Sequence, residues 1–107
     1  MEISNLINKT DYIILELMIK NESYSSYVSL STPYIISESK LSHVKVRQVL
    51  KNFILCGFVA EGSKDGNKKT YYITEKGIEH YKDIFALNDE DIEDMIKEYN
   101  SENKEDE

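Results

Sequence analysis

The sequence lacks the residues that disulfides, metal sites and membrane spans require. Its one cysteine, Cys56, excludes an intramolecular disulfide and a cysteine-based metal cluster. The two histidines, His43 and His80, are 37 residues apart, which is not a metal-ligand spacing. No apolar run approaches the roughly 20 residues of a membrane helix, and no signal-peptide pattern opens the chain. We therefore expect a cytoplasmic protein with no cofactor, no metal and no membrane partner.

The motifs of common enzyme classes are missing as well. We find no P-loop, no GxGxxG and no GxSxG, and nothing else in the chain indicates catalysis, so we predict that it is not an enzyme. With 107 residues and 40% hydrophobic content, the chain has the length of one domain with one core. We expect that domain to span residues 1–100, and we expect the acidic residues 101–107, which include no apolar side chain, to be disordered.

Charge is distributed unevenly along the chain. The net charge is −7, which is the wrong sign for a general nucleic-acid binder. Residues 40–72, however, contain seven basic and only two acidic side chains, a net charge of +5 that leaves −12 for the rest of the chain. A positive block in an acidic protein favours binding of a polyanion to one face.

Residues 42–57 have the pattern of a helix. Ser42 is a suitable N-cap, and Gly57 is a suitable C-terminal stop. The apolar residues recur at i, i+3, i+4 and i+7, and so form one buried stripe of Val46, Val49, Leu50 and Phe53. The opposite face carries Val44, Gln48, Lys51 and Leu55, and is less polar than is usual for a helix that reads DNA.

A lysine-rich hairpin follows this helix. Strands are expected at residues 58–61 and 70–74, and the Asp65-Gly66 pair between them is a strong hairpin signal. The loop at residues 63–69 contains three lysines and Asn67. These are side chains that reach phosphates and groove edges, although charged hairpin tips also serve solubility alone.

The flanking segments predict four more helices and a short strand. We expect a buried helix at residues 11–21, a short strand near 27–31, a second helix at 33–39 and a turn at 40–41. Thr74 caps a further helix, and the last begins at residue 88 or 89. Helices with a small antiparallel sheet indicate the α+β class.

At this point the residues resemble a known family. The pattern Ser42-x3-Val46-x3-Leu50-x2-Phe53-x3-Gly57 is similar to the recognition-helix signature of winged helix-turn-helix proteins. Residues 72–77, YITEKG, resemble the exit from the wing in MarR- and PadR-like members. The resemblance covers residues 10–87. It implies a three-helix core, a two- to three-stranded antiparallel wing sheet and one or two C-terminal helices. In size and style the chain also looks similar to TcpK-type relaxosome accessory proteins of clostridial conjugative plasmids.

The family resemblance nominates a DNA-binding surface. It places the start of the third helix and the wing against DNA, with contacts expected from Lys40, Ser42, His43, Lys45, Arg47, Gln48, Lys64, Gly66, Asn67, Lys68 and Lys69. An ordinary solvated helix face remains the alternative for the helix. We expect the wing to matter at least as much as the helix, because it has the denser cluster of DNA-suited groups.

The last helix has an apolar stripe with two possible partners. It comprises Ile92, Met95, Ile96 and Tyr99, again at i, i+3, i+4 and i+7. The stripe either packs on its own domain or forms the seam of a homodimer, and we favour the dimer. A dimer suits a repeat or palindromic DNA site, because two half-sites multiply a modest affinity.

We therefore predict a sequence-specific double-stranded DNA-binding protein. Its role would be that of an accessory factor at a plasmid or phage transfer or replication origin, with other proteins of a DNA-processing complex as partners, or that of a small transcriptional repressor. The alternative is a winged helix that docks a protein. The outward Val44 and Leu55 and the net charge of −7 favour this alternative, and the +5 block disfavours it.

Overall fold

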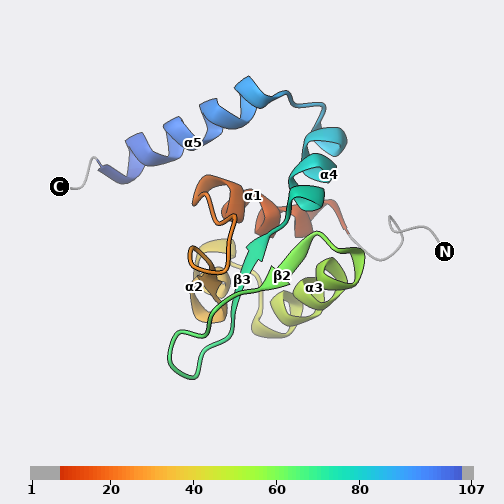
Figure 1. The fold of residues 1–107 in the computed structure, drawn as a ribbon, viewed down its shortest axis with the longest axis vertical. Helices are drawn as coiled ribbons and strands as arrows, with labels where there is room; N and C mark the ends of the chain where they lie inside the picture. Colours follow the sequence, from red (N-terminus) through yellow and green to blue (C-terminus); the bar gives the residue numbers. More distant parts are fainter. Residues whose placement is uncertain (1–7, 105–107) are drawn as a thin grey trace.

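The computed structural model describes residues 8–104, which form five α-helices and a small sheet (Figure 1). A short 3₁₀ turn, Lys9–Tyr12, leads into the first helix. The elements then follow as α1 (Ile13–Lys20), β1 (Leu30–Ser31), α2 (Thr32–Ser39), α3 (His43–Cys56), β2 (Val59–Glu61), β3 (Thr70–Ile73), α4 (Glu75–Phe85) and α5 (Asp89–Lys104). This order confirms the α+β winged helix-turn-helix class.

The sheet has three antiparallel strands in the order β1-β3-β2. β3 is central because it pairs with β2 through the wing hairpin and with the distant β1 on its other edge. The registers place Val59 opposite Ile73 and Leu30 opposite Tyr71. The two-residue β1 is the short strand expected from the sequence, and it closes the sheet against α2.

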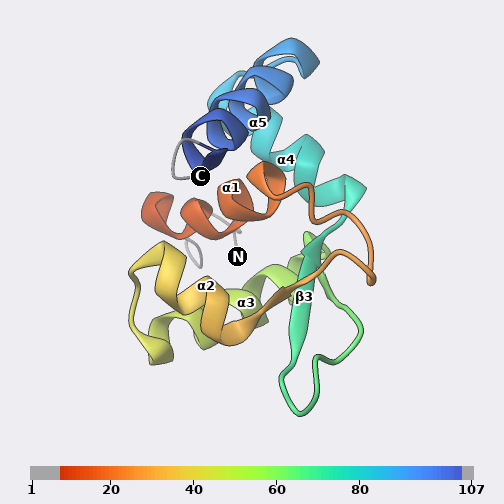
Figure 2. The same ribbon diagram turned by 90° about the vertical axis from the view of Figure 1, so that its left-hand side faces the viewer.

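The core is built around α1, which lies between two layers of helices. Figure 2 shows α4 and α5 on one side of α1 and α2 and α3 on the other. Ile14, Leu15, Met18 and Ile19 are fully buried, since both sides of the helix are covered. Within residues 8–104, no helix combines the length and apolarity needed to cross a bilayer.

Side-chain hydroxyl caps fix where α2, α3 and α4 begin. The hydroxyl oxygen of Ser31 accepts a hydrogen bond from the Tyr34 amide, and that of Ser42 accepts one from the Lys45 amide. Thr74 caps α4 in the same way. These bonds satisfy amide groups that have no partner inside the helix, so the sequence determines the starts of α2, α3 and α4 locally.

The apolar stripe of α5 packs on its own chain. Ile92 is buried, and Met95 and Ile96 lie against the core next to α1. The Tyr99 hydroxyl lies 3.1 Å from the Tyr34 hydroxyl of α2. Burial and this neighbouring hydroxyl raise the pKa of Tyr34 to about 12. The structure thus favours the first of the two partners that the sequence left open for this stripe.

α5 is also longer than predicted. It continues to Lys104, so residues 101–104, which were expected to be disordered, are helical. Extending a helix adds one hydrogen bond per residue fixed and needs no apolar contact. Residues 105–107, like residues 1–7 at the start of the predicted domain, lie outside the described part of the chain.

An aromatic cluster joins the start of α1, the end of α3 and α4. The Tyr12 hydroxyl lies 2.8 Å from Nε2 of His80. The imidazole stacks on Phe58, with the ring centres 4.1 Å apart. Burial lowers the pKa of His80, and Asp83 opposes that shift more weakly. His80 is therefore a structural residue that packs best in its neutral form.

Candidate nucleic-acid interface

The wing is a narrow, exposed hairpin at residues 63–69. Asp65 and Lys68 pair through two reciprocal backbone hydrogen bonds of 3.0 Å each, which leaves Gly66 and Asn67 as a two-residue turn. Gly66 has a φ of +67°, a backbone conformation that favours glycine. Figure 2 shows the hairpin projecting away from the helices. Lys64, Asn67, Lys68 and Lys69 are exposed on it.

The start of α3 lies beside the wing and presents the positive end of its helix dipole. Its first turn contains no acidic residue, so no side chain of that turn neutralises the positive end of the helix dipole. His43, Arg47 and Gln48 are exposed. The Ser42 side chain is engaged as the cap of this helix, through its 3.1 Å bond from the Lys45 amide.

A groove of about 980 Å³ separates α2 and α3 from the wing. It brings together five of the predicted contact residues, His43, Arg47, Asn67, Lys68 and Lys69. Apolar side chains, the buried Leu50 among them, also line it. The groove therefore has cationic groups on two walls, one from the helix and one from the hairpin. This arrangement suits a strand of phosphates lying between them.

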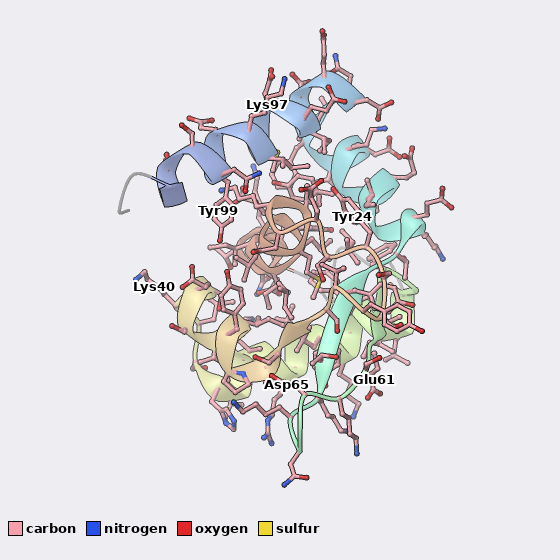
Figure 3. The ribbon with its side chains drawn as sticks, turned by 60° about the vertical axis from the view of Figure 1, so that its left-hand side comes forward. Tyr24, Lys40, Glu61, Asp65, Lys97 and Tyr99 are labelled. Carbon is pink, nitrogen blue, oxygen red and sulfur yellow. The ribbon has the colours of Figure 1, made fainter. Side chains whose placement is uncertain are left out.

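The other predicted residues lie outside the lining of this groove. Lys64 and Gly66 are on the wing, and Gln48 is on the outer face of α3. Lys40 extends from the end of α2, away from the wing (Figure 3). Lys45 points toward Asp11 instead of toward the groove. Its ammonium nitrogen lies 3.4 Å from Oδ1 of Asp11, a residue that is only 1% exposed. Lys45 is thus engaged in an ion pair within the chain.

The sequence analysis missed several residues that line the groove. Lys51 follows Arg47 by about one helical turn, and this +4 spacing was a signal by which the sequence could have identified it. Thr32 of α2 gave no such signal, because only the fold brings it to the wing. Its amide and its hydroxyl both donate to the carbonyl oxygen of Lys69, over 3.1 and 3.2 Å.

Positive charge is concentrated near the wing and negative charge on α5, although Lys97 lies on α5 and Glu61 and Asp65 lie near the wing (Figure 3). In Figure 3 the nitrogen-bearing side chains gather around the wing and α3, and α5 lies at the far end. Seven acidic residues of α5 are described there: Asp89, Glu90, Asp91, Glu93, Asp94, Glu98 and Glu102. The described residues contain no group of three or more histidine, cysteine or acidic side chains that would hold a metal ion. The wing end is therefore the face that a polyanion would meet.

Comparison with known proteins places this fold in a family, although no protein-family model matches the chain. The DNA-binding protein TubR of Clostridium botulinum C phage is 38% identical over 78 residues, which are 73% of this chain and 96% of that protein. The solution structure of the DNA-binding TubR fragment from Clostridium botulinum matches the same shares with a TM-score of 0.60.

More distant structures share the fold. TubR from Bacillus megaterium pBM400 is 19% identical and matches with a TM-score of 0.67 over 78% of this chain and 91% of that protein. The chain in the Staphylococcus aureus MepR–DNA complex is 13% identical and matches with a TM-score of 0.61 over 92% of this chain and 74% of that one. The identity and coverage of the Clostridium protein decide the family. The chain belongs to the TubR family of winged helix-turn-helix proteins.

Proposed function

We propose that the chain binds double-stranded DNA sequence-specifically and acts as a homodimer. The observation that carries the proposal is the groove in which α3 and the wing present cations to each other. Arg47 and Lys51 lie on one wall and Lys68 and Lys69 on the other. The TubR relative and the MepR complex are named for DNA binding, which supports the same assignment.

The two walls have different tasks in this mechanism. The wing lysines bind phosphates and hold the protein in register on the duplex, and Asn67 at the hairpin tip reads base edges in the adjacent groove. The open first turn of α3 directs His43 and Arg47 at the DNA, supported by the helix dipole. Because the acidic α5 lies at the far end, DNA is held on one face only.

The dimer seam that we propose lies on α3. The stripe expected to form the seam, on α5, is covered by α1. The outer face of α3 instead exposes Val44 and Leu55, at 75% and 76%, with Gln48 between them; Lys51 and Leu55 stand at the edge of this face, where it meets the groove. Two such helices packed antiparallel about a twofold axis place Val44 opposite Leu55 of the other copy. His43 and Arg47 line the groove and not this seam, so they stay free for DNA on each α3.

A pair of substitutions tests this seam. Leu55→Glu changes an exposed side chain, so we expect monomers in sedimentation with an unchanged melting temperature. Ile96→Glu places a charge against α1, so we expect a protein destabilised by about 1–3 kcal/mol. Dimers that persist in Leu55→Glu but disappear in a folded Ile96→Glu protein would return the seam to α5.

The biological role that we propose is that of a small DNA-binding factor of a mobile element. The TubR relative comes from a phage, which supports a site on phage or plasmid DNA. An accessory role at a transfer or replication origin, as in the TcpK-type proteins, and a role as a transcriptional repressor both remain predictions. Other proteins of a DNA-processing complex are further expected partners.

Selection from random duplexes tests the main proposal. At physiological salt, we expect the protein to enrich a repeated or palindromic sequence from a pool of random double-stranded 40-mers. The second candidate function, a winged helix that docks a protein, is favoured by the exposed Val44 and Leu55. If the folded protein retains no duplex, the result would favour the protein-docking function.

A further inference from the structure

The wing leaves the domain through a neck that joins three separate segments of the chain. These are residues 26–29, which precede β1, residues 62–63, which follow β2, and Thr70, with which β3 begins. The first segment belongs to a serine-rich stretch to which the DNA-binding surface assigns no role. Thr70 is only 4% exposed, so the neck is closed around it.

A chain of hydrogen bonds connects the three segments. The Ser29 hydroxyl donates to Oγ1 of Thr70 over 2.8 Å, and the Thr70 hydroxyl donates to the carbonyl oxygen of Ser63 over 2.5 Å. The Ser63 amide in turn donates to the carbonyl oxygen of Ser26 over 3.1 Å. The Ser29 hydroxyl also lies 3.0 Å from the carbonyl oxygen of Ser26, so its single proton can go to either acceptor, both of which belong to the neck. The Thr70 hydroxyl is the central link because it both donates and accepts.

The packing around the neck leaves no spare room. A Cβ atom added to Gly62 would lie 2.4 Å from Oγ of Ser29 and 2.9 Å from Oγ1 of Thr70. Both distances are far below van der Waals contact, so any side chain at Gly62 would push these hydroxyls apart. The hydrogen-bonded neck therefore requires glycine at this position.

The β3 side of the wing is also anchored to α2, one residue before Thr70. The amide and the hydroxyl of Thr32 both bind the carbonyl oxygen of Lys69. At the tip, Asp65 and Lys68 pair through their backbones. With both strands held at the neck and the tip closed, the direction of the wing is set at the neck.

We propose that Thr70 is the positioning residue of the wing, acting with Ser29 to hold Lys64, Lys68 and Lys69 at the angle at which they meet phosphates. This inference rests on the proposed DNA-binding function. The neck itself supplies no charge. It makes the affinity and the salt dependence of binding depend on two hydroxyl groups that touch no DNA.

The test compares Thr70→Val, which keeps the shape and removes the hydroxyl, with Thr70→Ser, which keeps the hydroxyl. The probe is a fluorescein-labelled duplex enriched in the random selection, titrated by anisotropy between 50 and 200 mM salt at a temperature well below melting. Ser29→Ala and Gly62→Ala are second variants in case Thr70→Val fails to fold. Ser25→Ala, an exposed serine of the same stretch, is the matched control.

For Thr70→Val we expect binding about tenfold weaker at 100 mM salt. We also expect the slope of log affinity against log salt to flatten by about 1, equal to one lost phosphate contact, although no charge is removed. Thr70→Ser should restore both values, and Ser25→Ala should change neither. Amide hydrogen exchange at residues 64–69 of the free protein should be faster in Thr70→Val.

The outcomes separate this inference from the proposed function. A lower melting temperature with unchanged affinity and slope would make Thr70 merely structural and overturn the inference, provided that the wing lysines still govern the slope. If the unmodified protein retains no duplex, the proposed function fails and the inference fails with it.

Discussion

Removing the charges of the wing is the sharpest test of the binding surface. The variant Lys64→Ala, Lys68→Ala, Lys69→Ala deletes three exposed side chains. Within residues 8–104 their ammonium groups make no ion pair or side-chain hydrogen bond, so stability should change by no more than about 0.5 kcal/mol per site. Any change in binding then reflects lost contacts to DNA and not unfolding.

The magnitude follows from counterion release. Each lost phosphate contact lowers the slope of log affinity against log salt by about 0.9, so three contacts lower it by about 2.7. Over a fourfold change of salt, from 50 to 200 mM, the variant should therefore lose about 40-fold less affinity than the unmodified protein. Lys45 is left out of this count because it is paired with Asp11.

The measurement is anisotropy of a labelled duplex at four or more salt concentrations. The control is Lys76→Ala, Lys97→Ala, which removes two exposed charges outside the groove and should leave the slope unchanged. An unchanged slope in the wing variant would refute the phosphate-binding role of the hairpin. An equal fall in the control would show that overall charge, and not the position of the wing, governs binding.

Three further predictions concern single residues. Burial lowers the pKa of His80 below its usual 6.5, so its contribution to folding stability is complete above about pH 6.5 and is lost as the pH drops below that value. Chemical denaturation below pH 6.5 should therefore show a falling free energy of unfolding, and His80→Gln should make that fall smaller. Ala86 has a left-handed φ of 54°, so Ala86→Gly should raise the free energy of unfolding by about 1 kcal/mol, and an unchanged melting curve would argue against strain there. Asn67→Ala should reduce the preference for the selected duplex over a random one, and an equal loss on both would contradict base reading by Asn67.

The sequence determined the local parts of this protein. Ser42 and Thr74 begin helices because their hydroxyls accept bonds from amides three residues on. Gly57 ends α3 in a left-handed conformation, and Gly66-Asn67 turns the wing between the paired residues Asp65 and Lys68. Each of these depends on a few neighbouring residues. The family resemblance therefore rested on short sequence patterns, each of which spans one or two helical turns or a single hairpin.

The tertiary structure decided what each surface faces. The periodicity of α5 predicted an apolar stripe but not its partner, and α1 covers it. Lys45 is positive in any reading of the sequence, yet the fold pairs it with Asp11, 34 positions away. Ser29 and Thr70 meet only because β1 and β3 are neighbours in the sheet. Contacts between distant segments depend on packing, which periodicity along the chain does not encode, so only the fold reveals how the wing is held.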